Sequence, residues 1–234
     1  CVAMKTVKLA EVVKKLESGA RPKGGVSADS GTIPSLGAEH LNDSGSFNFH
    51  STKFVTTGFY ENLKSGKIQS NDILIVKDGA TTGKVSFVDN DFPFEKAAIN
   101  EHIFKITVES KTCFGKYVFY YLKSSGGKRQ ILKDFRGATV GGISRNFIEL
   151  TKIPLPPLDD QIRIATILSR VENLIAKRKE SIQLLDDLLK STFLEMFGIL
   201  NGSYNMWDID SLSLHTEIVS GVTKGKKYKN EVTA

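Results

Sequence analysis

The sequence has few of the residues from which disulfide frameworks and metal sites are built. Its 2 cysteines, Cys1 and Cys113, stand far apart, and neither belongs to a CxxC or CxxH pattern. Neither a disulfide framework nor a zinc site is therefore predicted, and we expect Cys113 to be a small buried hydrophobe. The histidines show neither metal-ligand spacing nor a companion nucleophile motif. The 4 histidines are His40, His50, His102 and His215.

Long apolar runs are also missing. No stretch of about eighteen apolar residues occurs, and the first residues, CVAMKTVKLAEVV, lack the apolar core of a secretion signal. Neither membrane insertion nor export is indicated, so a cytoplasmic setting is the default expectation.

Motifs for catalysis are incomplete. GATTGK at 79–84 resembles a phosphate loop, but the glycines are one residue too close and Val85 stands where a hydroxyl should hold magnesium. Glu109 and Lys111 form the Glu-x-Lys pattern of metal-dependent nucleases, with Asp91 upstream, but such triplets are common by chance. No glycine-rich cofactor loop follows a strand. The sequence therefore predicts a binding protein and not an enzyme.

Basic charge is concentrated in one region. The chain has 234 residues, is 40% hydrophobic and carries a net charge of +6, enough for one domain plus an appendage or two small domains. Residues 1–157 carry 22 Lys and Arg against 15 Asp and Glu. Within them, residues 111–145 carry 8 basic residues against the single Asp134. This excess indicates a polyanionic partner such as nucleic acid, although a solvated helix face would explain part of it.

A long helix is predicted from Pro156 to Phe197. Two prolines precede it, Asp159 and Asp160 place negative charge in its first turn, and Gly198 follows it. A helix from Asp159 to Phe197 would be roughly 58 Å long. Apolar residues recur at steps of four and three, as in a coiled coil. This apolar stripe consists of Ile164, Leu168, Val171, Ile175, Ile182, Leu185, Leu189 and Met196.

The stripe is interrupted by Arg178 and Thr192, and polar residues at such positions can fix register and partner number. The alternative is an ordinary core helix, which is normally much shorter. We expect an extended helix that needs a partner.

The part before this helix mixes strands and helices, so the predicted fold class is α+β. A short amphipathic piece over 4–17 is followed by predicted strands at 33–36, at 47–55, in a hairpin over 71–89, and at 102–108. Residues 114–122 have aromatics at helical spacing, which favours core packing over base stacking. A polar, glycine-rich loop at 136–146 then leads to the long helix.

The sequence after the predicted helix resembles the first residues of the chain. Residues from Met206 align without a gap with those from Met4 at an offset of 202, pairing Ser220-Gly221 with Ser18-Gly19. Residues 206–234 are therefore expected to open a second copy of the first domain.

One continuous run carries a family resemblance. GGISRNFIELTKIPLPPLDDQIRIATILSRVENLI, from Gly141 to Ile175, resembles the junction between a target recognition domain and the conserved helix in specificity subunits of type I restriction-modification enzymes. Ser18-Gly19, NDILIVKDGATTGK and AAINEHIFKI also resemble blocks of such a domain. Asp160 departs mildly from the pattern, because Glu is usual before Gln161.

The resemblance implies a non-catalytic subunit that reads two DNA half-sites with two recognition domains held apart by antiparallel helices. It implies docking to modification subunits that use S-adenosylmethionine, and through them to restriction subunits that use ATP and magnesium, with no cofactor in this chain. Residues 1–156 would be a recognition domain, 157–198 the spacer helix, and 199–234 a linker with the start of a second domain. We expect two copies to pair through the apolar stripe as a homodimer.

The expected DNA contacts are basic or polar residues in the predicted loops and basic region. They are Arg21, Lys23, Lys77, Lys84, Lys128, Arg129, Arg136, Thr139, Arg145 and Asn146. Sequence alone does not divide them between phosphates and bases. Two other hypotheses stay open: an interaction scaffold with an incidental basic patch, and a methyltransferase or nuclease in its own right.

Overall fold

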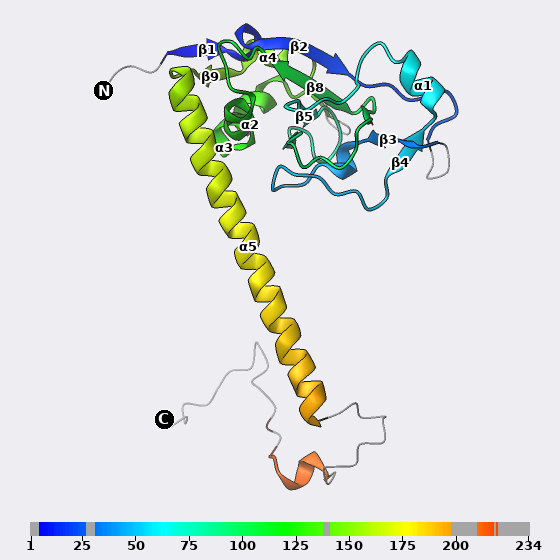
Figure 1. Cartoon of the computed structure of the whole chain (residues 1–234), viewed down its shortest axis with the longest axis vertical. Helices are drawn as coiled ribbons and strands as arrows, with labels where there is room; N and C mark the ends of the chain where they lie inside the picture. Colours follow the sequence, from blue (N-terminus) through cyan, green and yellow to red (C-terminus); the bar gives the residue numbers. More distant parts are fainter. Residues whose placement is uncertain (1–4, 27–30, 138–140, 198–209, 218, 220–234) are drawn as a thin grey trace, which may run out of the picture. The chain divides into compact units, whose positions relative to one another are not determined.

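The computed structural model describes residues 5–26, 31–137, 141–197, 210–217 and 219. The chain divides into two compact units, Cys1–Leu174 and Ile175–Ala234. The helix α5, Leu158–Phe197, runs unbroken through this boundary (Figure 1). Thr139, Gly198 and most of the segment expected to begin a second domain lie outside the described residues.

The first unit mixes strands and helices, which confirms the α+β prediction. Its strands are β1 Thr6–Lys8, β2 Val13–Ser18, β3 Ile33–Leu36, β4 Lys53–Val55, β5 Ile73–Val76, β6 Val85–Phe87, β7 Ala98–Ile99, β8 Ile103–Val108 and β9 Lys152–Pro154. The helices before α5 are α1 Thr57–Asn62, α2 Gly115–Lys123, α3 Ser125–Ile131 and α4 Phe147–Leu150. Short 3-10 helices include Leu132–Asp134 and, in the second unit, Leu212–Leu214.

The described strands form three sheets. The largest has the order β2-β8-β5-β6 and is antiparallel throughout, the second has the order β4-β3-β7, and β1 pairs with β9. The pair β3–β7 is parallel. Because β1 pairs with β9, the chain segment just before α5 is bound to the beginning of the domain.

Strand β5 separates two hydrophobic clusters. Ile73 and Ile75 face a cluster shared with α2, whereas Leu74 and Val76 face the other side, as the two-residue period of a strand requires. All of these side chains are fully buried. A run of four apolar residues with no polar alternation is therefore what a strand covered on both faces needs.

A buried ion cluster joins β2, β8 and the start of β5. The ammonium of Lys105, which is 3% exposed, lies 2.7 Å from Glu17 and 3.0 Å from Asp72. Asp72 also accepts a hydrogen bond from the Thr107 hydroxyl over 2.7 Å. Burial alone would raise the pKa of Glu17, but hydrogen bonds and charge from Lys105 and Lys15 outweigh it and lower that pKa.

The strand expected over 47–55 is shorter in the structure, because only β4 at its end forms a strand, while Phe47 makes an isolated bridge with Leu41. Phe47 and Phe49 instead stack with ring centroids 5.8 Å apart, and Phe92 packs edge-on at 5.3 Å from Phe47. Aromatic packing has replaced strand pairing there.

Other sequence predictions are confirmed. The hairpin over 71–89 appears as β5 and β6, and the aromatics of 114–122 are on α2, where Tyr117, Phe119 and Tyr120 are buried. Cys113 is 1% exposed, and burial raises the pKa of its thiol to about 11. Helix α5 begins two residues after the expected start. Among the described residues, no helix is both long enough and apolar enough to cross a membrane.

Candidate nucleic-acid interface

Two loops of the first unit are joined through their main chains. One is the turn of residues 77–83 between β5 and β6, and the other is the described part of residues 136–146, which leads into α4. The Gly79 N–H donates to the Gly141 carbonyl over 3.1 Å. Gly79 has φ +93°, a conformation that glycine adopts without strain. We call these segments the paired loops.

The second contact between the paired loops depends on the lack of a side chain at Gly142. The Ile143 N–H donates to the Lys77 carbonyl over 2.8 Å. A Cβ atom on Gly142 would lie 2.8 Å from both the Cβ of Asp78 and the Lys77 carbonyl oxygen, closer than real Cβ contacts. Glycine at 142 therefore allows the close approach of the two backbones.

A buried carboxylate fixes both ends of the loop that contains residues 136–146. Asp134, whose side chain is 0% exposed, accepts hydrogen bonds from the Ser144 N–H over 2.6 Å and from the Ser144 hydroxyl over 2.7 Å. Its other oxygen accepts from the Arg136 guanidinium over 3.1 Å. The Arg136 side chain is 73% exposed, so Asp134 orients this cation while leaving it open to solvent.

A chain of polar and charged side chains connects the paired loops with the segment after β2. The His102 ring donates from Nδ1 to Asp78 over 2.5 Å, and its Nε2 lies 3.3 Å from Glu101. Glu101 in turn pairs with the Arg21 guanidinium over 3.0 Å. The Lys77 N–H donates to the His102 carbonyl over 2.8 Å. These contacts place Arg21 beside loops that are far from it in sequence.

The first part of α5 packs on the domain through one narrow face. Gln161 and Ala165, one turn apart, are 0% exposed. The Gln161 side chain accepts from the Phe114 N–H over 2.9 Å and donates to the Pro156 carbonyl over 2.8 Å. This glutamine therefore satisfies backbone groups at the start of both α2 and α5.

The same face continues along the helix at Ser169 and Glu172. The Tyr120 hydroxyl donates to Glu172 over 2.8 Å and lies 2.9 Å from the Ser169 hydroxyl. Lys123 on α2 also pairs with Glu172. Burial is the main cause that raises the pKa of Tyr120 to about 12. The domain thus holds α5 by a polar, hydrogen-bonded face.

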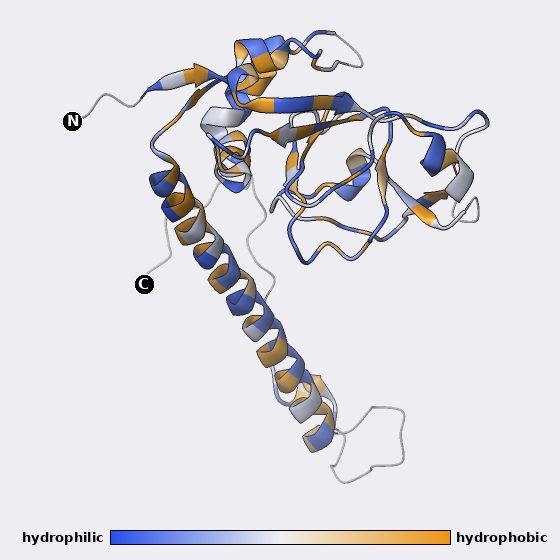
Figure 2. Cartoon of the chain, turned by 45° about the horizontal axis from the view of Figure 1, so that its top comes forward, coloured by the Kyte–Doolittle hydropathy of each residue, from blue (hydrophilic) through white to orange (hydrophobic). Residues whose placement is uncertain are grey.

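The apolar stripe lies on a different face of α5, and its residues are exposed. Figure 2 shows the hydrophobic residues of the helix as orange bands. Its exposed fractions are Ile164 37%, Leu168 38%, Val171 46%, Ile175 51%, Ile182 50%, Leu185 58%, Leu189 70% and Met196 58%. Apolar surface of this extent on one helix marks an interaction surface.

Comparison with known proteins assigns the chain to a family. Residues 2–185 match the model of the type I restriction modification DNA specificity domain. The chain belongs to this family. The chain is 29% identical over 208 residues to the type I restriction enzyme MjaVIII specificity subunit of Methanocaldococcus jannaschii, covering 85% of this chain and 45% of that protein. It is 32% identical over 119 residues to the putative MjaX specificity subunit of the same organism, covering 50% and 26%.

Solved structures share the fold. A chain of a type I R-M system aligns with a TM-score of 0.59 at 18% identity, covering 82% of this chain and 44% of that one. The HsdS subunit from Thermoanaerobacter tengcongensis aligns with a TM-score of 0.54 at 18% identity, covering 89% and 52%. The chain spans about half the length of these structures and less than half of the curated relatives.

Several cations predicted as DNA contacts are brought together in the specificity domain. Lys77 and Arg136 lie on the paired loops. Arg21 is connected to these loops by its ion pair with Glu101, which in turn contacts the His102 ring bound to Asp78. Arg145 follows on the same loop, where its guanidinium donates to the Leu16 carbonyl on β2. These four residues come from three separate segments of the sequence and define the candidate interface.

The other predicted contacts are placed less directly. Lys84 pairs with Asp43 over 3.2 Å and is 19% exposed. Lys128 and Arg129 are exposed on α3, and Lys23 is exposed in the loop after β2; none of the three forms an ion pair within the described residues. Asn146 is exposed at the start of α4, without a side-chain cap to the helix. All of these remain predictions, as does Thr139 outside the described residues.

Sequence reasoning missed the acidic partners of these cations. Asp134 and Glu101 hold Arg136 and Arg21 in place, and Asp78 holds the ring of His102, which is not one of the predicted contacts. One signal was available for Asp134, which is the single acidic residue among eight basic ones in 111–145. No comparable signal marked Asp78 or Glu101, because their partners come from distant segments.

The incomplete catalytic motifs have structural roles. GATTGK forms the turn between two antiparallel strands, not the strand-to-helix loop that cradles phosphates. Glu109 accepts from the Lys111 N–H over 3.4 Å, as in a local turn. Within the residues that the structure describes, no three His, Cys, Asp or Glu side chains are grouped as a metal ion would require.

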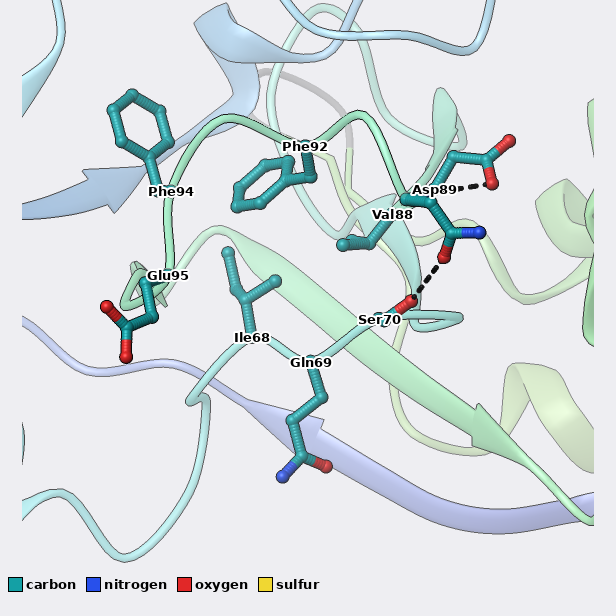
Figure 3. Close-up of a pocket in the computed structure, with 9 residues that line it drawn as sticks. Ile68, Gln69, Ser70, Val88, Asp89, Phe92, Phe94 and Glu95 are labelled. Carbon is teal, nitrogen blue, oxygen red and sulfur yellow. Dashed lines mark hydrogen bonds between the residues drawn. The ribbon is translucent and has the colours of Figure 1, made fainter.

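One cavity lies elsewhere in the specificity domain. It has a volume of about 260 Å³ and is lined by residues before β5 and after β6, at the opposite end of these strands from the 77–83 turn (Figure 3). Ile68, Val88, Phe92 and Phe94 supply its apolar wall. Its charged lining residues are the acidic Asp89 and Glu95, which would repel phosphate, so it does not extend the candidate interface.

Proposed function

We propose that this chain is a DNA-reading specificity subunit of a type I restriction-modification enzyme, which binds one half of a bipartite site and catalyses no reaction itself. The observation that carries the proposal is the pair of loops joined by main-chain hydrogen bonds, which gathers Arg21, Lys77, Arg136 and Arg145. Membership of the specificity domain family supports it.

Arg136 is the strongest candidate for base reading. Its guanidinium is anchored at one side by Asp134 and exposed at the other, so part of its conformational freedom is removed before DNA binds. An arginine held in this way can donate two parallel hydrogen bonds to a guanine edge. The neighbouring cations are suited to phosphates, which position the protein along the duplex.

The partners follow from the same proposal. The subunit docks modification subunits, which bring S-adenosylmethionine for adenine methylation, and through them restriction subunits, which bring ATP and magnesium. We assign no cofactor to this chain. The resemblance of residues 141–175 to the conserved junction of specificity subunits supports this docking role.

Pairing through the apolar stripe completes the proposal. The domain packs on the face of α5 that carries Gln161, Ala165 and Glu172, so Ile164, Leu168 and Val171 of the stripe stay exposed where a second helix could pack. A second copy of this chain supplies the same stripe with twofold symmetry, giving two recognition domains at a fixed separation.

DNA binding is tested by fluorescence anisotropy with the full chain over a range of salt concentrations. The affinity is expected to fall steeply as salt rises, because phosphate contacts release counterions. Arg136→Ala should cost about 1 to 3 kcal/mol and relax the preference at one base pair if Arg136 reads a guanine. If it contacts phosphate, binding to all sequences should weaken alike and the salt slope should flatten by about one. Lys152→Ala, an exposed cation on β9, is the matched control.

The recognised sequence is tested by mapping methylated adenines in a genome where this chain is the sole specificity component. A symmetric interrupted motif supports paired copies, and an asymmetric one contradicts the symmetric homodimer. Binding that is absent or independent of salt would reject DNA reading and favour the interaction scaffold.

A further inference from the structure

One large apolar side chain stands out on the candidate interface. Among the large hydrophobic side chains of described residues ahead of α5, Phe135 is the most exposed at 45%, followed by Leu150 at 39%. The core of this domain buries its other phenylalanines fully or in part. An exposed ring of this size forgoes favourable burial in the free protein, so a ligand that covers it would recover that free energy.

The Phe135 ring is held in position. It lies so close to Gly141 that a Cβ atom there would come within 2.1 Å of the ring. The backbone on either side is fixed: the Phe135 N–H donates to Leu132 over 3.1 Å, and Arg136 exchanges two hydrogen bonds of 2.9 Å with Gly142. The tip of the ring thus lies against Gly141 of the paired loops, and 45% of the residue is exposed just before Arg136 in the chain.

The chemistry of the ring selects a base and not a phosphate. A phenyl ring donates no hydrogen bond and carries no charge, so it gains nothing from the phosphates. In the major groove, the apolar group that a base pair offers is the C5 methyl of thymine, which phenylalanine side chains contact. Phe135 and the following Arg136 would then read an apolar and a polar feature of the same half-site.

We infer that Phe135 is a specificity-determining residue that contacts a thymine methyl group in the recognised half-site. This inference rests on the proposed DNA-reading function and adds to it an apolar contact that the charge pattern of the sequence does not indicate. Asp134 is a positioning residue for the contact, because it directly precedes Phe135 and accepts two hydrogen bonds from Ser144 of the opposite side of the loop.

The test uses the full chain with Phe135→Ala, Phe135→Leu and the control Leu150→Ala, which removes a similarly exposed apolar side chain on α4. The probes are a duplex carrying the mapped methylation site, a scrambled duplex of the same composition, and site duplexes in which each thymine in turn is replaced by uracil. Phe135→Ala should weaken binding to the site about fivefold, as expected for one lost methyl contact. It should leave the scrambled duplex and the salt slope unchanged.

The uracil duplexes identify the contact. At one position, uracil should weaken wild-type binding by a similar factor, and Phe135→Ala should then cause no further loss. Phe135→Leu, which keeps an apolar side chain, should retain most of the affinity, whereas a ring that only supports the loop would show no coupling to any thymine.

Three results would overturn the inference: Phe135→Ala equal to Leu150→Ala, an equal loss on site and scrambled duplexes, or the same loss on every uracil duplex. Each of them requires that the wild-type chain bind the site in a salt-dependent manner. Failure of that wild-type binding would instead reject the proposed function, so the two failures are distinguishable.

Discussion

The carboxylate of Asp134 is the point at which the stability of the domain and the presentation of the proposed DNA-reading loop can be changed together. Asp134→Ala removes the acceptor of two hydrogen bonds from Ser144 and leaves the Ser144 N–H without its partner. Hydrogen bonds to a charged group contribute about 1.5 to 3 kcal/mol each. The bond to Arg136 adds at most about 1 kcal/mol, because that guanidinium is 73% exposed.

Removing the carboxylate also removes the cost of burying it, so the net loss is smaller than the sum of the bonds. We expect Asp134→Ala to lower the free energy of unfolding by about 3 kcal/mol. With a denaturant slope of roughly 2 to 3 kcal/mol/M, the urea midpoint should fall by about 1 M. DNA affinity should fall as well, because the loop backbone that carries Arg136 and follows Phe135 loses the hydrogen bonds that fix it.

Two variants separate the effects on stability and on binding. Asp134→Asn keeps one acceptor for Ser144 and should lose about 1 kcal/mol. Arg136→Ala removes only the exposed partner, so it should alter the urea midpoint little while reducing DNA affinity. If Asp134→Ala unfolds at the same urea concentration as Arg136→Ala, the carboxylate does not anchor the loop and the reasoning is refuted.

Three further predictions concern the buried ion cluster and the long helix. Lys105→Met leaves the carboxylates of Glu17 and Asp72 buried without their cation and should cost about 3 to 5 kcal/mol, measured by urea unfolding. Because the folded pKa of Glu17 lies below its ordinary 4.5, its contribution to stability is present above pH 4.5 and is lost as the pH falls through the folded pKa. The urea midpoint of the wild type should therefore drop more between pH 6 and pH 3 than that of Glu17→Gln; equal drops would contradict this. Leu185→Lys should weaken self-association at least about a hundredfold by sedimentation, since two buried leucines are lost per dimer. Gln183→Lys adds the same charge two residues away, on a different side of the helix, and should have little effect.

The parts of the fold that were predicted correctly are those with a local cause. The apolar run of β5, the turn at Asp78 and Gly79 and the period of α5 are each written in consecutive residues. The segment from Phe47 was misjudged because strand alternation and the packing of partly buried aromatic rings give the same pattern. Its rings pack against Phe92, a contact 45 residues away that no local window contains.

The candidate site was predicted in composition but not in arrangement. The basic character of 111–145 identified Arg136 and Arg145, but not that Arg21 would reach the same loops through Glu101. That meeting depends on how β2 and β8 pair, which is a long-range property of the sheet. Phe135 escaped notice because a single phenylalanine in a sequence is normally assigned to the core.

The contacts that join the paired loops have a consequence for how specificity can diversify. They run from N–H to carbonyl, so they do not depend on the side chains at the positions they connect, with the exception of the glycines Gly79, Gly141 and Gly142. Exposed residues such as Phe135 and Arg136 are thus free to be exchanged while the loop geometry persists. A domain built in this way can acquire a new target sequence by a few surface replacements, without rebuilding the frame that carries them.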